Sequence, residues 1–448
     1  MEISLGLSNN PLPTSTATAS HAFGSVAAAR VELASPVPSE GNVGGKRRLG
    51  GLKSWSGKCG RIVQKCGESS MRAHPVKIGD KWMEYQGVGN WEGLLDPLDE
   101  NLRSEILRYG EFVEAAYNSF EFDLSSEHYA SCKFSRSSLL EQAGVRETGY
   151  CLTKNLKATC GVRLPEWVDR APRWMMTRSS WIGYVAVCQD RREIARLGRR
   201  DVVIALRGTV TCLEWIENLR ASLTCLHGHA DDDAPMVESG FWSLYTSGDE
   251  CTPSLREMIR EEVAQVMATY ADDDEPISLT LTGHSLGAAL ATLAAYDIRA
   301  NFAGDANKDG PMVTVVSFGG PRVGNRSFRS HLERGGTKIL RIVNSDDPVT
   351  KVPGFLSACD GKHVGVSGAD VGLPGWLRKG IGGDPRWKYA DLGQELRLSS
   401  SESSYLDKWD VATCHDLGTY LHLVSGFVSS TCPLRATARK MLHRIHHK

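Results

Sequence analysis

Residues 277–295 limit the possible folds of this chain more tightly than any other segment. Residues 277–282, Ile-Ser-Leu-Thr-Leu-Thr, predict a β-strand, and the alanine-rich residues 288–295 predict a helix. The pentapeptide Gly-His-Ser-Leu-Gly at residues 283–287 joins the two. A strand that passes through a sharp glycine turn into a helix is a unit of α/β architecture, and here the turn carries a serine.

Ser285 stands at the centre of this turn and is the candidate nucleophile. In such a nucleophile elbow the serine backbone is strained, and the flanking Gly283 and Gly287 leave room for it. The turn lifts the serine Oγ clear at the carboxyl edge of the sheet, at a helix N-terminus whose dipole favours negative charge. The backbone N–H of Leu286 then points towards a developing oxyanion, so Leu286 is predicted as one oxyanion donor.

Further strands and helices are predicted along the rest of the chain. Apolar, β-rich runs occupy residues 181–188, 202–206, 277–281, 313–318 and 339–343. Helical patterns occupy residues 102–117, 255–270 and 288–299. We therefore expect an α/β-hydrolase fold, with a mainly parallel central sheet, helices on both faces and a lid. The first two strands are joined by a short polar segment, so they could pair antiparallel.

A serine hydroxyl needs a base, and the base needs an acid that orients it. In α/β-hydrolases the acid follows the serine along the chain, and the histidine comes last. The predicted strand at 339–343 leads into Asn-Ser-Asp-Asp-Pro, which brings Asp346 and Asp347 to the sheet edge where the serine lies. Either aspartate could serve as the acid.

The candidate bases are the histidines downstream of the serine. They are His331, His363, His415 and His422, besides three in the basic terminal tail. His415 begins a helical pattern that runs over residues 415–422. A histidine that enters a helix from a loop can reach across the top of the sheet, so His415 is favoured over the mid-helix His422.

A second oxyanion donor is expected from a loop that follows an earlier strand. The strand predicted at 202–206 continues into Arg-Gly-Thr, and Thr209 could offer both its N–H and its Oγ. The amphipathic residues 212–219 would hang over the pocket as a lid, or dock as an ordinary surface helix. Residues 353–403 are rich in glycine and irregular, and they predict a long excursion over the surface.

The two ends of the chain differ in composition from its centre. Residues 1–29 are rich in Ser, Thr and Ala with few acids, a basic stretch follows, and no apolar core of a secretory signal is present. We therefore predict a transit peptide with a disordered linker over residues 1–75, for the chloroplast ahead of the mitochondrion; a plain disordered tail is the alternative. The hydrolase domain is expected over residues 76–430 and a basic tail over 431–448.

Charge and apolar patterning exclude some functions. The formal net charge is −1, so no overall field favours nucleic acid or an anionic membrane. No apolar run approaches the roughly 18 to 20 residues that span a bilayer, so contact with lipid would occur at a surface. The twelve cysteines form no Cys-x-x-Cys pair and no spacing that suits zinc. No oligomeric state follows from these patterns.

Several motifs together resemble the class 3 (fungal triacylglycerol-type) lipases. They are Arg-Gly-Thr at 207–209, the pentapeptide at 283–287, Ser-Phe-Gly-Gly-Pro-Arg-Val-Gly-Asn at 317–325 and the segment around Asp347. Within that class the chain is most similar to the plant phospholipase A1 class I lipases, which include the plastid enzymes that feed jasmonate synthesis. The likeness extends through residues 86–98, 181–187 and 420–424, and covers roughly residues 82–427.

The resemblance assigns roles residue by residue. It places the nucleophile, the base and the oxyanion donors on Ser285, His415, Thr209 and Leu286. The family's acid lies in an Asn-x-x-Asp-x-Val-Pro-like segment, which places it on Asp347 rather than Asp346. This chain has Pro-Val-Thr at 348–350, so the usual proline is absent at 350 and another directly follows the aspartate. The lid falls within residues 211–240.

The resemblance also implies an activity. It implies release of fatty acid from the sn-1 position of phospholipids or galactolipids, at a bilayer surface and without a metal or organic cofactor. One alternative keeps this chemistry and changes the substrate to neutral acylglycerols. Another is a non-catalytic signalling module, because a fold does not fix a function. The presence of all three triad members and of the oxyanion segment favours an enzyme.

Overall fold

The computed structural model describes residues 78–145, 148–160, 179–209, 222–226, 234–249, 252–302, 310–353, 389–402 and 410–430. All described residues belong to the second of the two units of the chain, Ser56–Lys448. The predicted leader, the basic tail and the lid helix at 212–219 lie outside the described residues and stay predictions. Within the described part, no helix is long and apolar enough to cross a membrane.

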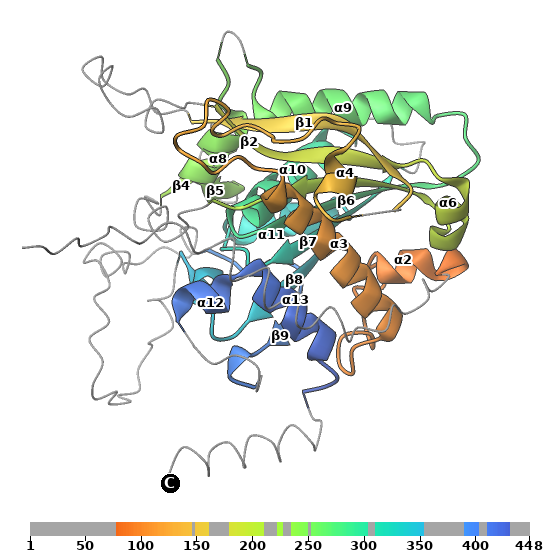
Figure 1. The fold of residues 1–448 in the computed structure, drawn as a ribbon. Helices are drawn as coiled ribbons and strands as arrows, with labels where there is room; N and C mark the ends of the chain where they lie inside the picture. The colour runs from red at the N-terminus through yellow and green to blue at the C-terminus, as the bar shows by residue number, and fades with distance from the viewer. Residues whose placement is uncertain are drawn as a thin grey trace, which may run out of the picture. The chain divides into compact units, whose positions relative to one another are not determined.

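A seven-stranded sheet forms the centre of the second unit, in the order β1-β2-β3-β6-β7-β8-β9 (Figure 1). β1, β2 and β3 pair antiparallel, and each strand from β3 to β9 runs parallel to its neighbour. The strands are β1 (Tyr150–Thr159), β2 (Ser179–Cys188), β3 (Arg200–Leu206), β6 (Ile277–His284), β7 (Met312–Phe318), β8 (Lys338–Asn344) and β9 (Gln394–Leu398). Because parallel strands end at the same edge, the segments after β3, β6 and β8 meet there.

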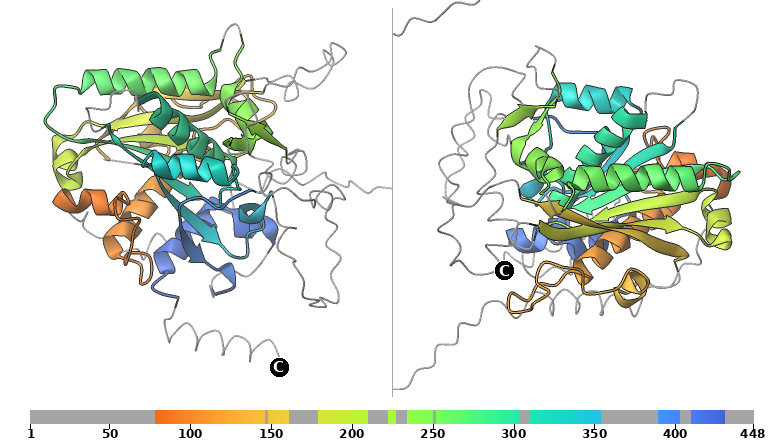
Figure 2. Two further views of the ribbon diagram at one scale, coloured as in Figure 1. Left: turned by 180° about the vertical axis from the view of Figure 1, so that it is seen from behind. Right: turned by 90° about the horizontal axis from the view of Figure 1, so that it is seen from above.

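Helices cover both faces of the sheet (Figures 1 and 2). Leu102 and Ile106 of α3 pack with Tyr420 of α13 in one apolar core, while α9 and α10 supply Ile259 and Leu290 to the other. The helices are η1 (Gly79–Lys81), α2 (Trp82–Tyr85), α3 (Glu100–Asn118), α4 (Leu139–Gln142), α6 (Arg191–Leu197), α8 (Ser239–Thr246), α9 (Leu255–Thr269), α10 (Leu286–Phe302), α11 (Arg326–Arg334), η3 (Val349–Lys351), η6 (Ser400–Glu402), α12 (Val411–His415) and α13 (Leu417–Gly426).

Local sequence sets where the long helices begin. Asp99 caps α3, because its carboxylate accepts the N–H groups of Asn101 and Leu102. α9 begins at a capping box, in which Ser254 accepts the N–H of Glu257 and the Glu257 carboxylate accepts the N–H of Ser254. The helices predicted over 102–117, 255–270 and 288–299 are confirmed as α3, α9 and α10.

Two strands depart from the sequence prediction. The antiparallel pairing of β2 with β3 is confirmed, but β1 precedes them and was not predicted, because polar residues interrupt its apolar pattern. The prediction that residues 353–403 are wholly irregular is wrong at their end. Gln394–Leu398 form β9, which pairs with β8 through backbone bonds and buries only Leu396 and Leu398. A five-residue strand with so few apolar positions leaves little pattern in the sequence.

A small second sheet pairs β4 (Leu223–Cys225) with β5 (Met236–Glu238), within the range predicted for the lid.

Candidate active site

The predicted elbow forms where β6 passes into α10. β6 ends at His284, α10 begins at Leu286, and Ser285 between them has a φ of 57°. This left-handed conformation is strained for a residue with a Cβ, and it is the geometry that an elbow requires. The Ser285 N–H donates to the carbonyl of Phe318 at 3.0 Å, which ties the turn to the end of β7.

Close backbone contacts explain both glycines of the pentapeptide. A Cβ on Gly283 would lie 2.4 Å from the carbonyl carbon of Gly287, and a Cβ on Gly287 would lie 2.3 Å from the carbonyl oxygen of Leu206. Backbone atoms cannot give way to such contacts, so only glycine fits at either position. The start of α10 therefore packs directly against the end of β3, the strand that leads to Thr209.

Asp347 and His415 form a buried hydrogen-bonded pair at the same edge. His415 Nδ1 lies 2.7 Å from Asp347 Oδ2, and Asp347 is 0% exposed. An ionised carboxylate only accepts, so Nδ1 carries the proton and Nε2 is left as the basic nitrogen of His415. The Tyr420 hydroxyl donates to the same Oδ2 at 2.7 Å, and the Val349 N–H donates to Oδ1 at 2.9 Å. These two donors fix the orientation of the carboxylate.

The structure separates the two aspartates that the sequence left open. Asp346 is exposed, and its Oδ2 accepts the Ser399 hydroxyl and the Ser401 N–H, each at 2.9 Å. Asp347 turns inward instead and meets His415. Among the other candidates, His422 lies within α13, where burial lowers its pKa, and His331 lies on α11 beside the Ser327 carbonyl. His363 lies outside the described residues.

The local prediction for His415 is wrong in one respect. His415 does not begin a helix but ends α12, and α13 begins two residues later at Leu417. Asp416 between them is extended, with φ −70° and ψ 135°, and its carboxylate caps α13 by accepting the Thr419 N–H. An aspartate directly after the histidine is a helix-start residue, so the sequence contained this break. His415 thus stands at a junction between two helices.

The predicted oxyanion donors lie beside the elbow. Thr209 follows the end of β3, and its Oγ1 is buried without a hydrogen-bond partner in the part of the chain that the structure describes. A Cβ on Gly208 would lie 2.9 Å from Ser285 Cβ, so the Arg-Gly-Thr segment approaches the nucleophile closely. Leu286 is the first residue of α10, and its N–H is one of the first-turn donors that intrahelical bonds do not use.

A buried arginine that the sequence analysis did not single out holds this segment. Arg207 is 4% exposed, and it donates to the carbonyls of Trp181 and Gly208 and to the Ser180 hydroxyl. Its guanidinium lies 3.6 Å from the centroid of the Phe120 ring. Burial lowers the pKa of Arg207 to about 10. The sequence shows that Arg207 directly precedes Gly208 and Thr209, but only the structure shows which groups its guanidinium binds.

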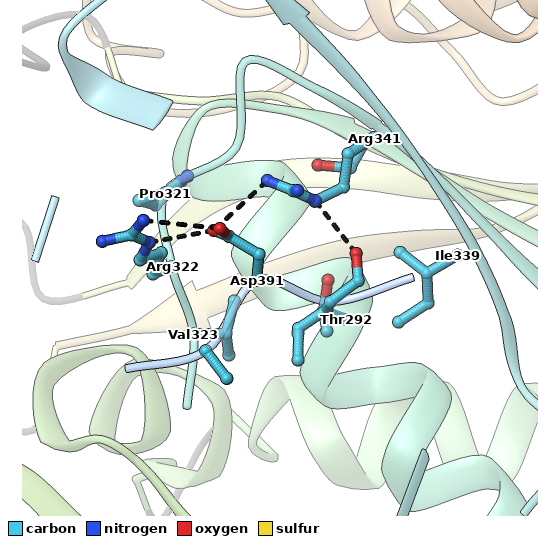
Figure 3. Close-up of a pocket in the computed structure, with 10 residues that line it drawn as sticks. Thr292, Pro321, Arg322, Val323, Ile339, Arg341 and Asp391 are labelled. Carbon is cyan, nitrogen blue, oxygen red and sulfur yellow. Dashed lines mark hydrogen bonds and ion pairs between the residues drawn. The ribbon is translucent and has the colours of Figure 1, made fainter. Parts of the chain in front are cut away.

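The described residues offer little to a metal ion. No group of three or more His, Cys, Asp or Glu side chains among them could hold one. A small pocket in Figure 3 is lined by Thr292, Arg322, Arg341 and Asp391, among others, and by none of the predicted catalytic residues. Asp391 lies between the two arginines, 2.9 Å from Arg322 Nε and 3.6 Å from Arg341 Nη1. The arginines are thus already paired within the protein, and this pocket is not the candidate site.

The fold and the elbow define the chain as an α/β-hydrolase. A sequence model of the family described as Lipase (class 3) matches residues 203–357. The chain is 61% identical over 378 residues to "Phospholipase A(1) DAD1, chloroplastic" of Arabidopsis thaliana, covering 83% of this chain and 82% of that protein. It belongs to the class 3 lipase family, within the plant phospholipase A1 group.

Two further similarities concern more distant proteins. The chain is 39% identical over 355 residues to "Galactolipase DONGLE, chloroplastic" of Arabidopsis thaliana, covering 77% of this chain and 69% of that one. The crystal structure of a lipase from Rhizopus microsporus var. chinensis matches with a TM-score of 0.37 and 18% identity, over 58% of this chain and 71% of that one. This last likeness is too distant to support a conclusion.

Proposed function

We propose that the protein hydrolyses the sn-1 acyl ester of membrane phospholipids or galactolipids, with Ser285, His415 and Asp347 as its catalytic triad. Membership of the class 3 lipases and 61% identity to a phospholipase A1 support ester hydrolysis on lipids. The observation that carries the residue roles is the buried 2.7 Å pair of His415 and Asp347 at the sheet edge where Ser285 occupies its strained elbow.

The proposed reaction is a two-step acyl transfer. The Nε2 of His415 takes the hydroxyl proton of Ser285, and the serine oxygen attacks the ester carbonyl carbon. As the tetrahedral intermediate collapses, the imidazolium returns that proton to the leaving lysolipid alkoxide. Water, activated by the same nitrogen, then cleaves the acyl-serine and releases the fatty acid. Asp347 keeps the imidazole in the required tautomer and stabilises its positive charge.

The oxyanion of both tetrahedral intermediates is assigned to Thr209 and Leu286. The Thr209 hydroxyl supports this role because it is a buried donor with no partner among the described residues. An orphaned hydroxyl in a low-dielectric site carries a desolvation cost that a ligand oxyanion would offset. The Leu286 N–H lies at the N-terminus of the 17-residue helix α10, where the helix dipole favours negative charge.

The substrate would be met at a bilayer surface in the plastid. Both Arabidopsis relatives are named as chloroplastic, at 61% and 39% identity, which confirms the predicted plastid location. One relative is named a phospholipase and the other a galactolipase, so both head groups are kept in the proposal. The lid proposed within residues 211–240 would cover the site between encounters with lipid.

Lipids with different acyl chains at the two positions test this proposal. The purified full-length protein is incubated with phosphatidylcholine and with monogalactosyl diacylglycerol, each carrying distinct sn-1 and sn-2 chains. Mass spectrometry identifies the released fatty acid, and Ser285→Ala is the matched control. We expect release of the sn-1 chain alone by the wild type and none by the variant.

The other outcomes identify the alternatives. Release from triacylglycerol but from neither polar lipid would replace the proposal with a neutral acylglycerol lipase. Release of the sn-2 chain at an equal rate would contradict the positional assignment. If no lipid yields fatty acid above the level of Ser285→Ala, the signalling-module interpretation replaces the enzyme.

A further inference from the structure

Three hydrogen bonds connect the separate segments of the candidate site. The N–H of Gly208 donates to the hydroxyl of Tyr117 at 2.8 Å, and that hydroxyl lies 2.7 Å from His284 Nδ1. His284 Nε2 in turn lies 2.7 Å from the carbonyl oxygen of His415. We refer to Tyr117 and His284, with these three bonds, as the Tyr117–His284 relay. The mechanism described above assigns neither side chain a role.

The two ends of the relay determine the protons within it. A backbone N–H can only donate and a carbonyl can only accept, so His284 Nε2 carries a proton and donates it to the His415 carbonyl. In a neutral imidazole Nδ1 is then an acceptor, and the Tyr117 hydroxyl donates to it. The site favours the neutral form, because burial, and next the proximity of His415, lowers the pKa of His284 well below its ordinary value. Each donor in the relay therefore has an acceptor.

The relay touches three parts of the proposed catalytic machinery. Gly208 directly precedes the oxyanion donor Thr209, and His284 directly precedes the nucleophile Ser285. The third part is the backbone of the base, His415. One pair of side chains thus sets the spacing between the donor loop, the nucleophile and the base.

The packing around the relay leaves little room for adjustment. A Cβ on Gly208 would lie 2.5 Å from the Tyr117 hydroxyl and 2.9 Å from the His284 carbonyl oxygen. The rings of His284 and His415 have centroids 4.8 Å apart. A small movement of the Tyr117 hydroxyl would therefore pass to Gly208 and so to Thr209. Rate constants are sensitive to such small movements, since reacting groups must meet within narrow limits of distance and angle.

We propose that Tyr117 and His284 are positioning residues for ester hydrolysis, which hold the Thr209 loop and the His415 backbone at fixed distances from Ser285. The inference rests on the proposed function. Neither side chain is assigned contact with the reacting atoms, so their effect is on the transition state and not on the affinity for substrate. Loss of the relay then lowers kcat and leaves KM nearly unchanged.

Tyr117→Phe tests the first half of the relay. It removes the hydroxyl that receives the Gly208 N–H and keeps the ring. With a soluble short-chain ester as substrate, we expect kcat to fall about tenfold with KM within about twofold of the wild type. Tyr184→Phe is the matched control, because the buried Tyr184 hydroxyl donates to the Phe112 carbonyl of α3 at 2.8 Å without reaching the site. It should lower thermal stability comparably and leave kcat unchanged.

Two substitutions of His284 separate the two bonds of its ring. In His284→Asn the side-chain oxygen can take the place of Nδ1 and accept from Tyr117, but nothing reaches the His415 carbonyl. In His284→Gln the amide nitrogen can take the place of Nε2 and donate to that carbonyl. We expect each variant to lower kcat about tenfold and to retain a cooperative unfolding transition. The double variant Tyr117→Phe/His284→Gln should lose less kcat than the product of the two single losses, because both single substitutions remove the bond between Tyr117 and His284.

The outcomes distinguish this inference from the proposed function. If the wild type hydrolyses the ester through Ser285 but the folded Tyr117 and His284 variants keep kcat within about twofold, the relay has no positioning role. The same conclusion follows if Tyr184→Phe lowers kcat as much as Tyr117→Phe does. If Tyr117→Phe does not fold, the two His284 variants decide. Absence of Ser285-dependent turnover in the wild type would overturn the proposed function and the catalytic role of the relay together.

Discussion

The strands β3 and β6 carry buried polar groups at both ends, and the two ends are built differently. At the amino-terminal end, Asp201 of β3 accepts hydrogen bonds from Tyr150, Ser278 and Arg108, at 2.8, 2.8 and 3.2 Å. Arg199, 0% exposed, donates to Ser278 and lies 3.9 Å from Asp201. At this end each buried charge has partners of the opposite sign.

At the carboxyl-terminal end of the same strands, a backbone position is strained and a buried polar group lacks a hydrogen-bond partner among the described residues. Ser285 has a strained backbone there, and the Thr209 hydroxyl is buried without a partner among the described residues. Arg207 lies beside them and has no carboxylate among its described partners. We infer that the ion pairs at the amino-terminal end stabilise the fold. The hydrogen-bond donors at the carboxyl-terminal end remain available to bind the transition state.

Two buried carboxyls, Asp201 of β3 and Glu238 of β5, have pKa values shifted in opposite directions. Burial alone would raise the pKa of Asp201, but Arg199 and Arg108 outweigh burial and hold it below the ordinary value. Glu238, also 0% exposed, has no cation among its described partners, and burial raises its pKa to about 6. The two arginines thus favour the ionised form of Asp201, whereas burial favours the protonated form of Glu238.

The largest effect is expected at the catalytic end. Asp347→Asn keeps the shape of the side chain but leaves His415 in the wrong tautomer, so kcat should fall about 10⁴-fold with little change in stability. Steady-state hydrolysis of a soluble ester measures this, with Asp346→Asn as the matched control, because Asp346 faces solvent. An equal loss in both variants would contradict the assignment of Asp347.

A substitution at the amino-terminal end of β3 should change the stability of the fold and not kcat. Asp201→Asn removes a buried negative charge that faces Arg108 and Arg199, so the free energy of unfolding should fall by about 3–5 kcal/mol. Urea unfolding measures this value, and kcat of the folded fraction should stay within about twofold of the wild type. A large loss of kcat with unchanged stability would overturn the division between the two ends.

Removal of the unused donor should give a smaller loss of rate. Thr209→Val replaces the orphaned hydroxyl by a methyl group of similar size, and kcat should fall about 10²- to 10³-fold, as for other oxyanion donors. Stability should be unchanged or higher, because a buried polar atom without a partner is removed. A variant that keeps full activity would show that the Thr209 hydroxyl does not bind the oxyanion.

Glu238→Gln tests the carboxyl that has no cation among its described partners. A folded pKa of about 6, above the ordinary value of 4.5, means that the protonated form stabilises the fold. That stabilisation is complete below about pH 4.5 and is lost as the pH rises through 6. Glu238→Gln should therefore gain about 1–2 kcal/mol of stability over the wild type above pH 6 and almost none near pH 4.5. A gain that does not depend on pH would contradict the raised pKa.

The smallest effect concerns the strain at the elbow. Ser285→Gly and Ser285→Ala both lack the nucleophile, so any difference between them reports the backbone. Glycine adopts a φ of 57° without penalty, and the glycine variant should be about 1 kcal/mol more stable than the alanine variant. Equal stability would mean that the strain is relieved elsewhere.

The predictable parts of this molecule are those encoded by contiguous residues. The elbow follows from one segment, residues 277–295, and the strand predicted at 339–343, with the order of the triad along the chain, narrows the acid to two adjacent positions. Which aspartate turns inward depends on how the loop after β8 packs, and only the resemblance to the lipase family indicated Asp347. The Tyr117–His284 relay joins residues 167 positions apart, so it becomes visible only when α3 is packed against β6.

The most direct test of the central claim is the site of reaction with a lipid-like fluorophosphonate, which phosphonylates an activated serine. The full-length protein is labelled and digested, and the modified peptide is identified by mass spectrometry. We predict that Ser285 is the labelled residue and that labelling is lost in His415→Gln and retained in His422→Gln. Labelling of another serine, or of Ser285 at equal rates in both variants, would contradict the proposed catalytic site.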